Sequence, residues 1–266
     1  MRPFRRKARD VRPLLPPLVG LLPLALLLVL WQVFGHVDST EFPPPSTWLD
    51  ALRAVDDRDL LWPAIQRTVL VFAAALAAAT VVGAAAGTLL GASKTARSAF
   101  GPLADFLRNF PPPAAVPVAV LLLGNGLGMS LVVIVATALW PILLNTEEAV
   151  RAIPKARIDA GRSLGLSRRR QVTSMIVPGV MPMVMIGVRV ATPVCLIVTL
   201  LAEMLASTGG IGQLILERQR LYDSAGVFGC LAIVGALGLL ISVVVGAFER
   251  GLLKNWPPSH GDLQRS

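Results

Sequence analysis

The sequence has 266 residues, of which 54% are hydrophobic and 15% charged, and its formal net charge at pH 7 is +9. A mean hydropathy of +0.67 is far above that of a soluble globular domain, so this composition indicates a lipid bilayer as the solvent. The positive charge does not indicate a nucleic-acid partner, because the basic residues lie beside hydrophobic runs without the interleaved aromatic residues that a single-strand binder uses.

Six apolar stretches are each long enough to cross a bilayer, whose hydrocarbon core takes about 20 helical residues. They predict an all-α polytopic membrane protein with one transmembrane domain over residues 14–250, between a basic N-terminus at 1–13 and a tail at 251–266. No small-residue cleavage site follows the first stretch, so we expect it to be a retained span rather than a secretion signal. The predicted spans are residues 14–34, 64–91, 102–123, 129–148, 178–205 and 225–249.

Lysine and arginine residues set the expected orientation of these spans, because cytoplasmic loops are enriched in both. Placing the N-terminus in the cytoplasm puts most of the 25 basic residues on the cytoplasmic side. It also leaves the aspartate-rich loop between the first two spans on the outer side. We therefore expect both chain termini to be cytoplasmic.

The second predicted span contains glycines at every fourth position, namely Gly83, Gly87 and Gly91. This spacing aligns them on one helix face, where the missing side chains let another backbone approach closely. We expect this face to pack within the same chain, and a contact between two copies is the alternative.

Prolines interrupt the third predicted span at residues 111–113 and again at Pro117. They predict an irregular helix, whose unpaired carbonyl groups are tolerated at membrane depth only against protein or a wet cavity. Pro111 and Pro117 are therefore candidates for positions beside a pathway or beside an axis between two copies.

A basic, polar loop over residues 149–177 separates the fourth and fifth predicted spans. Pro154 can begin a helix there, and Gly165 suits a left-handed residue that ends the helix about three turns later. We expect Ser167 to cap a second short helix and Pro178 to mark the turn into the fifth span. The plain alternative is a loop whose charges only fix the topology. Apolar residues at helical spacing predict a short amphipathic helix outside the membrane, with a narrow stripe made of Ile153, Ala156, Ala160 and Leu164.

Arg189 and Glu203 are ionisable residues inside the fifth predicted span, and such residues normally face the protein interior or water. They lie about 21 Å apart along a helix, so they cannot pair within one straight helix. Arg189 could meet an anionic solute or, as we favour, tie helices together through carbonyl groups or a carboxylate. Glu203 precedes the glycine-rich segment STGGIG, and we assign it to a gate or scaffold.

The polar loop resembles the cytoplasmic signature of ABC-importer permeases, a Glu-Ala-Ala, three residues, Gly, nine residues, Ile-x-Leu-Pro pattern. The substitutions in this chain keep charge sign, small size or apolar character, and both intervals are kept. Four further segments resemble permeases of the nitrate, sulfonate and taurine branch, and the resemblance covers residues 42–250: FPPPSTWLDAL, LRNFPPPAAVPVAVLLLGNGLG, PGVMPMVMIGVRVA and AEMLASTGGIGQLI. The residues at the signature positions are Asp159-Ala160-Gly161, Gly165 and Met175-Ile176-Val177-Pro178.

The resemblance implies a type I importer permease of the bacterial cytoplasmic (inner) membrane, with six transmembrane helices and a cytoplasmic coupling helix between spans four and five. It implies two ATPase subunits that bind ATP and Mg²⁺, a second permease copy in a homodimer, and an extracytoplasmic solute-binding protein. The implied solute is a small anion such as a sulfonate, nitrate, bicarbonate or taurine, and the alternative is a vitamin precursor or another neutral or cationic solute. The residues implied in coupling to the ATPase are Asp159, Ala160, Gly161, Gly165 and Pro178.

The sequence has no phosphate-binding loop of the form G-x-x-x-x-G-K-[ST], and the nearest segment, GASKTARS, lacks the second glycine. We therefore expect no enzymatic activity and no cofactor or metal bound by this chain, with ATP hydrolysis on a separate subunit. Two other classes remain open. An ion-gradient transporter would use intramembrane carboxylates, of which Glu203 is nearly the only one, and often inverted repeats, which we do not find. A membrane scaffold would move no solute.

Overall fold

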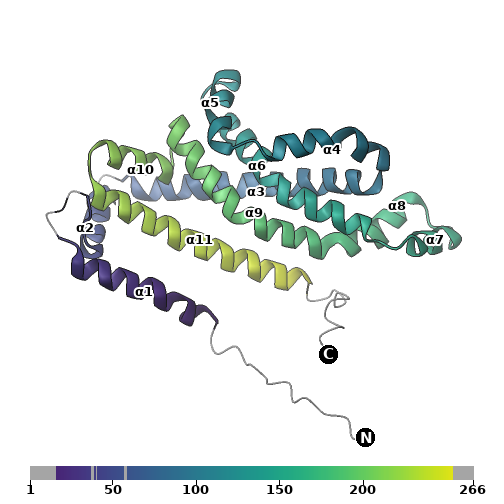
Figure 1. Ribbon diagram of the computed structural model, residues 1–266, viewed down its shortest axis with the longest axis horizontal. Coiled ribbons are helices and arrows are strands. Elements are labelled where there is room, and N and C mark those ends of the chain that lie inside the picture. Colours follow the sequence, from purple (N-terminus) through teal and green to yellow (C-terminus); the bar gives the residue numbers. More distant parts are fainter. Residues whose placement is uncertain (1–15, 37–38, 40, 57–58, 254–266) are drawn as a thin grey trace, which may run out of the picture.

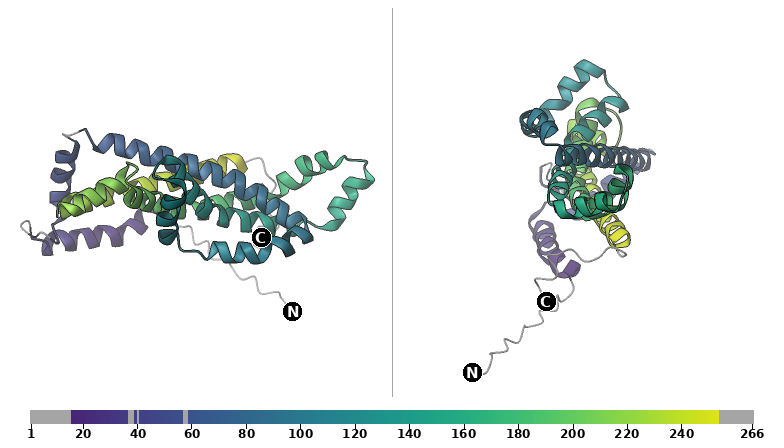
Figure 2. Two further views of the ribbon diagram at one scale, coloured as in Figure 1. Left: turned by 90° about the horizontal axis from the view of Figure 1, so that it is seen from above. Right: turned by 90° about the vertical axis from the view of Figure 1, so that its right-hand side faces the viewer.

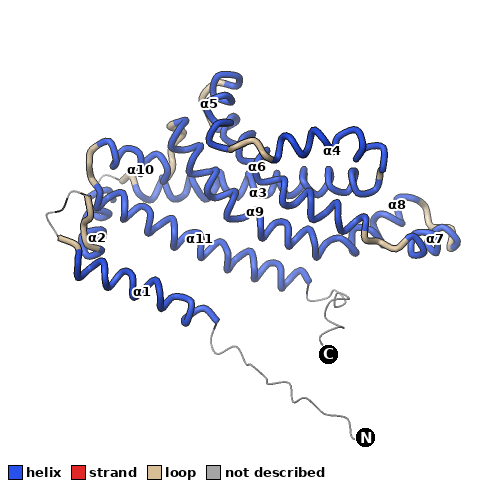
Figure 3. The backbone as a smooth tube through the Cα atoms, in the orientation of Figure 1, coloured by secondary structure: helices blue, strands red, loops and turns tan. Residues whose placement is uncertain are grey.

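The computed structural model describes residues 16–36, 39, 41–56 and 59–253, and every regular element among them is helical (Figure 1, Figure 3). The predicted basic N-terminus and the predicted tail from residue 254 onward lie outside the described residues. The elements are α1 Pro16–Phe34, α2 Pro45–Asp56, α3 Leu61–Ala92, α4 Lys94–Arg108, α5 Pro112–Leu123, α6 Leu127–Arg151, α7 Lys155–Ser163, α8 Arg168–Gln171, the π-helical turn η1 Val172–Ile176, α9 Val177–Ala206, α10 Ile211–Arg220 and α11 Ser224–Leu253.

Four helices in the described part of the chain are long and apolar enough to cross a bilayer, namely α3, α6, the helix from Arg169 to Ala206, and α11. The pair α4 and α5 makes a fifth if it is counted as one broken span, because its two helices meet at 101°. The prediction of an all-α polytopic membrane protein is confirmed. The third predicted span, residues 102–123, is not one helix, because the chain bends sharply within it.

Helices α3, α6 and α9 form the centre of the bundle (Figure 1, Figure 2). Their buried residues recur at intervals of three and four, as on α3 from Phe72 through Ala75 to Ala79. The most apolar stretch of the helix that contains α9 is 56% buried in the molecule, and that of α11 is 11% buried. Helix α9 is therefore central in the bundle and α11 is peripheral. One end of this bundle carries α7 and α8, and the opposite end carries α2 and α10; these are called the α7 end and the α10 end (Figure 1).

The three glycines of α3 lie against α6 of the same chain, and the two helices run in the same direction. A Cβ atom built on Gly83 would lie 2.9 Å from the carbonyl oxygen of Leu139, and one built on Gly91 would lie 2.7 Å from Val150 Cβ. A Cβ atom built on Gly87 would collide with a backbone carbonyl oxygen of α6. The missing side chains therefore let the two backbones touch along two turns of each helix.

Prolines shape the corner between α4 and α5. Pro111 precedes α5 with an extended backbone, at φ −70° and ψ 124°, and the next two prolines fill the first turn, where a backbone N–H has no helical partner. The prediction of an irregular helix is wrong at Pro117, because α5 continues through it and forgoes only the bond that the missing N–H would donate. The prolines change the direction of the chain at the corner and leave α5 helical.

The helix that contains α8, η1 and α9 begins before the fifth predicted span. The backbone N–H of Val177 donates to the carbonyl of Val172, five residues earlier, so η1 is one wide turn inside a continuous helix. The prediction that the chain turns into the span at Pro178 is therefore wrong. A proline ring presses against the carbonyl four residues before it, and the wide turn opens the backbone at that position.

Helix α1 is fastened to the rest of the molecule at the α10 end. The side-chain amide of Gln32 donates to Ser46 Oγ at 3.0 Å, and its oxygen accepts from the backbone N–H of Ser46 at 2.9 Å. Trp31 stacks on Phe42 with ring centroids 4.4 Å apart, and its ring meets that of Phe228 edge to face at 4.8 Å. The first predicted span thus coincides with a helix of 19 residues, which is apolar apart from Gln32.

Candidate functional site

Helix α7 stands clear of the transmembrane helices at one end of the molecule (Figure 1, Figure 2). It turns its buried Gly161 and half-buried Ile158 toward the chain. Three of the four residues of the predicted apolar stripe point away, since Ala156 and Ala160 are exposed and Leu164 is 78% exposed. The prediction is wrong for Ile153, which precedes the helix, is half-buried and packs on the central core. The helix therefore offers a small apolar surface that nothing in the described chain covers.

Both ends of α7 are defined by backbone geometry. Pro154 precedes its first turn. At the other end Gly165 is left-handed with φ +71°, its N–H donates to the Arg162 carbonyl at 2.9 Å, and the N–H of Leu166 donates to the Gly161 carbonyl at 3.1 Å. This is the Schellman arrangement, which favours glycine at the left-handed residue. The helix ends where the glycine spacing predicts.

Asp159 lies on the exposed side of α7, where its carboxylate is 3.4 Å from the guanidinium of Arg162, one turn later. Both side chains are about two-thirds exposed, at 65% and 67%. Such a pair adds little to stability because water screens it. The carboxylate therefore stays accessible to a partner, and α7 needs no rearrangement to present it.

A second hydrogen-bonded contact fastens the loop after α7. Ser167 Oγ accepts from the Arg170 N–H at 3.4 Å and so caps α8. The side-chain amide of Gln171 donates to the Leu166 carbonyl at 2.8 Å. A Cβ atom on Gly161 would lie 2.8 Å from Met175 Sδ, so α7 packs directly on the helix that leads into α9.

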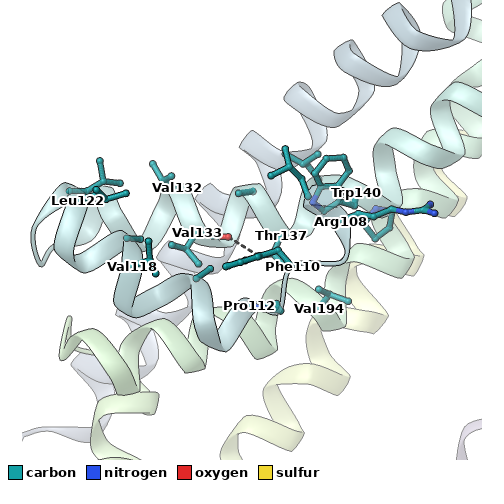
Figure 4. A pocket seen from close by; sticks show the side chains of 17 residues that line it. Arg108, Phe110, Pro112, Val118, Leu122, Val132, Val133, Thr137, Trp140 and Val194 are labelled. Atoms are coloured by element: carbon teal, nitrogen blue, oxygen red, sulfur yellow. Dashed lines mark hydrogen bonds between the residues drawn. The ribbon is translucent and has the colours of Figure 1, made fainter. Parts of the chain in front are cut away.

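The corner between α4 and α5 faces α6 and α9 across an apolar cavity of about 800 Å³ (Figure 4). Its polar lining is sparse. Thr137 Oγ donates to the Val133 carbonyl at 2.9 Å, and the guanidinium of Arg108 lies 3.2 Å from the carboxylate of Asp105. Of the predicted proline positions, neither Pro111 nor Pro117 lines the cavity. The lining residues are Leu107, Arg108, Phe110, Pro112, Ala115, Val118, Ala119, Leu122, Leu123, Val132, Val133, Ala136, Thr137, Leu139, Trp140, Pro141 and Val194.

Arg189 does not line this cavity. Its guanidinium lies 3.8 Å from the carboxylate of Glu249 on α11, and the two side chains are 72% and 16% exposed. The pair joins α9 to α11. This is the helix-tying arrangement that the sequence favours, and Arg189 keeps most of its surface accessible.

Glu203 is 2% exposed and holds three helices together at the α10 end. Its Oε2 accepts from Thr68 Oγ1 of α3 at 3.0 Å and from the Gly212 N–H of α10 at 2.9 Å. The same threonine oxygen accepts from the Ile211 N–H at 2.9 Å. The carboxylate thus lies at the N-terminus of α10, where backbone N–H groups favour negative charge.

The segment STGGIG supplies the backbone conformation that this contact requires. Ser207, Gly209 and Gly210 all have positive φ, at 48°, 86° and 96°. A Cβ atom on Gly210 would collide with the Glu203 carboxylate, so only glycine permits the approach. The segment is a tight turn that wraps the carboxylate.

Residues 79–254 match the family described as "Binding-protein-dependent transport system inner membrane component". The chain belongs to this family. Over 255 residues it is 29% identical to the bicarbonate transport system permease protein CmpB of Synechococcus elongatus, covering 91% of this chain and 90% of that protein. It is 26% identical to the taurine transport system permease protein TauC of Escherichia coli over 249 residues, or 91% of this chain and 89% of that protein.

The permease fold is also found in a solved structure. A chain of the MetNI methionine ABC transporter, in an inward-facing conformation, superposes with a TM-score of 0.64 at 18% identity and covers 74% of this chain and 97% of that chain. At this identity the match concerns the fold alone. It supports the arrangement of membrane helices described above.

Several residues that carry these permease contacts have weak signals in the sequence. Glu249 closes the last apolar run, and as the partner of Arg189 it could have been found by pairing opposite charges across predicted spans. Thr68 is a lone polar residue in an apolar run, which is a weaker signal. Gln171 has no signal in the sequence, because its acceptor is a backbone carbonyl whose position depends on the folded hairpin.

Proposed function

We propose that this permease is one half of a homodimeric import pathway in the bacterial inner membrane, driven by two ATPase subunits that bind ATP and Mg²⁺. An extracytoplasmic solute-binding protein delivers the solute. Helix α7 is the coupling helix, with Asp159, Ala160, Gly161 and Gly165 forming and shaping its contact with the ATPase. Pro178 lies at the start of α9, which receives the movement.

The free surface of α7 carries this proposal. A partner shifts a conformational equilibrium only if it binds the two states differently, and moving a population from about 1:99 to 99:1 takes about 5.5 kcal/mol of differential binding. A short helix with its apolar stripe outward can be held tightly by a cleft in one nucleotide state and loosely in another. The Schellman turn at Gly165 and the cap at Ser167 give the helix a fixed shape on which such a cleft can act.

The orientation follows from the charges near the two ends. Basic residues gather at or near the α7 end of their helices, and the enrichment of such residues on the inner side of membranes supports a cytoplasmic placement of that end. They are Lys94, Arg97, Arg151, Lys155 and Arg250. The α10 end then faces outward and receives the solute-binding protein. Helix α1 serves as a sixth span, since its 19 residues rise about 28 Å, close to the thickness of the hydrocarbon core.

The apolar cavity is the proposed part of the pathway within this copy, with the Pro111 corner beside it. The exposed apolar residues of α4 and α5 around it, including Phe106, Leu121 and Leu122, give the second copy a surface to cover. Arg189 and Glu203 hold helices α11 and α10 in place around this pathway. Since similar permeases are named for bicarbonate and taurine, we propose a small anion as solute, with sulfonates and nitrate in the same class.

The proposal is tested by substituting one exposed leucine at each end. Leu164→Asp places a charge in the outward stripe of α7 and should abolish capture of the co-expressed ATPase subunit by the tagged permease in detergent. Leu221→Asp makes the same change at the α10 end, where the leucine is 64% exposed, and should leave capture unchanged. Equal capture by both variants would contradict the assignment of α7.

A further inference from the structure

The hairpin formed by residues 152–167 is fastened at two separate points to the continuous helix that contains α8, η1 and α9. Gln171 closes the loop by donating to the Leu166 carbonyl at 2.8 Å. Gly161 lets α7 lie directly on Met175, whose Sδ would be 2.8 Å from a Cβ atom at that glycine. The Gln171 side chain also lies over Gly161, with its Cγ 3.6 Å from the same Cβ position. One face of α7 is therefore held, while its opposite face stays free.

The π-helical turn η1 decides which side chains make these contacts. Ile176 packs on the central core and the buried Val180 follows it by four residues, as on any α-helical face. If the helix before Ile176 were α-helical, the residue on the same face one turn earlier would be Val172. Because η1 contains one more residue than an α-helical turn, Gln171 takes this place, and Val172 is 40% exposed. The extra residue thus places the Gln171 amide, which bonds to the hairpin, on the same helix face as Ile176 and Val180, which pack on the core.

We propose that Gln171 and Met175 are positioning residues that make α7 and α9 move as one rigid body, so that displacement of α7 by its partner is transmitted to the transmembrane helices. The inference rests on the proposed function of α7 and adds the part of the chain that carries the movement inward. It assigns different tasks to the two faces of α7. The outward stripe binds the partner, and the inward face fixes the direction of the movement.

A distance measurement tests the rigid body directly. Spin labels are attached through Ser163→Cys on α7 and Ile186→Cys on α9, both exposed, in a chain whose buried cysteines carry Cys195→Ala and Cys230→Ala. Labelled chains are diluted with unlabelled chains so that only distances within one copy are observed. In the complex with its ATPase, we expect one narrow distance distribution that is the same without nucleotide and with bound ATP.

Variants then loosen each contact. Gln171→Glu keeps the size of the side chain but replaces the donor with an acceptor that faces a carbonyl, so the share of molecules outside the main distance should rise about fivefold. Gln219→Glu makes the same change at an exposed site on α10 and should not alter the distribution. Gly161→Val should broaden it by collision with Met175, and adding Met175→Ala should restore the narrow distribution.

The outcomes separate this inference from the proposed function. A distance that changes with nucleotide in the otherwise unaltered chain would overturn the rigid body, as would a Gln171→Glu variant indistinguishable from the Gln219→Glu control. Both results can arise while the ATPase is still captured through α7. Failure of the unlabelled, unaltered chain to capture the ATPase would instead contradict the proposed function.

Discussion

Gly87 is the position where the packing of α3 on α6 is most sensitive to an added methyl group. A Cβ atom there would collide with a carbonyl oxygen of α6 and lie 2.8 Å from Thr146 Cβ. Neither neighbour is the mobile end of a long side chain, so Gly87→Ala must push the two helices apart. Overpacking of this kind costs about 1–3 kcal/mol, while alanine gains about 1 kcal/mol over glycine in helix propensity. We expect a net destabilisation of up to about 2 kcal/mol.

Gly246→Ala is the matched control for this change. It lies on α11, also in mid-helix, and a Cβ atom there would meet nothing within 4 Å. The control should be neutral or stabilised by up to about 1 kcal/mol. Both variants are compared with the unaltered chain by unfolding in mixed micelles at increasing denaturing detergent, followed by circular dichroism. A Gly87→Ala variant as stable as the Gly246→Ala variant would refute the packing argument.

Three further substitutions probe the other contacts. Thr68→Val removes one of the two hydrogen bonds to the Glu203 carboxylate and leaves the Ile211 N–H without its acceptor, so it should cost about 2–4 kcal/mol of unfolding free energy, whereas Thr68→Ser should cost less than half as much. Arg189→Gln leaves the Glu249 carboxylate, which is only 16% exposed, without its cationic partner inside a membrane span and should cost about 1–3 kcal/mol in the same unfolding assay. Ala136→Trp should fill the cavity and stop solute uptake by vesicles without reducing ATPase capture, while Ala236→Trp on α11 should leave uptake unchanged.

The sequence predicts those features of the fold that depend on local pattern. Apolar length locates α3, α6, α9 and α11 to within a few residues, and the four-residue glycine spacing picks out the helix face that contacts α6. The left-handed Gly165 follows from the same local reasoning, since only a residue without a side chain adopts that conformation freely.

Features that depend on partners distant in the chain are not predicted. Pro178 looks like a break because proline is a helix breaker in isolation, and only the wide turn before it shows how the helix continues. Pro117 misleads in the same way. Thr68, the partner of Glu203 on α3, lies 135 positions away in the chain, and no spacing rule relates residues so far apart. The 101° angle between α4 and α5 is likewise not predicted, although the prolines at 111–113 mark where the chain turns.

The continuous helix from Arg169 to Ala206 has 38 residues and is about 57 Å long, well beyond the hydrocarbon thickness of about 30 Å. It must therefore emerge into water or headgroups on at least one side of the membrane. One end lies against the hairpin and the other ends beside the wrapped carboxylate of Glu203. Displacement of its hairpin end would be carried along one continuous helix toward its Glu203 end, with the wide turn η1, Pro182 and Pro193 as the places where that helix can bend.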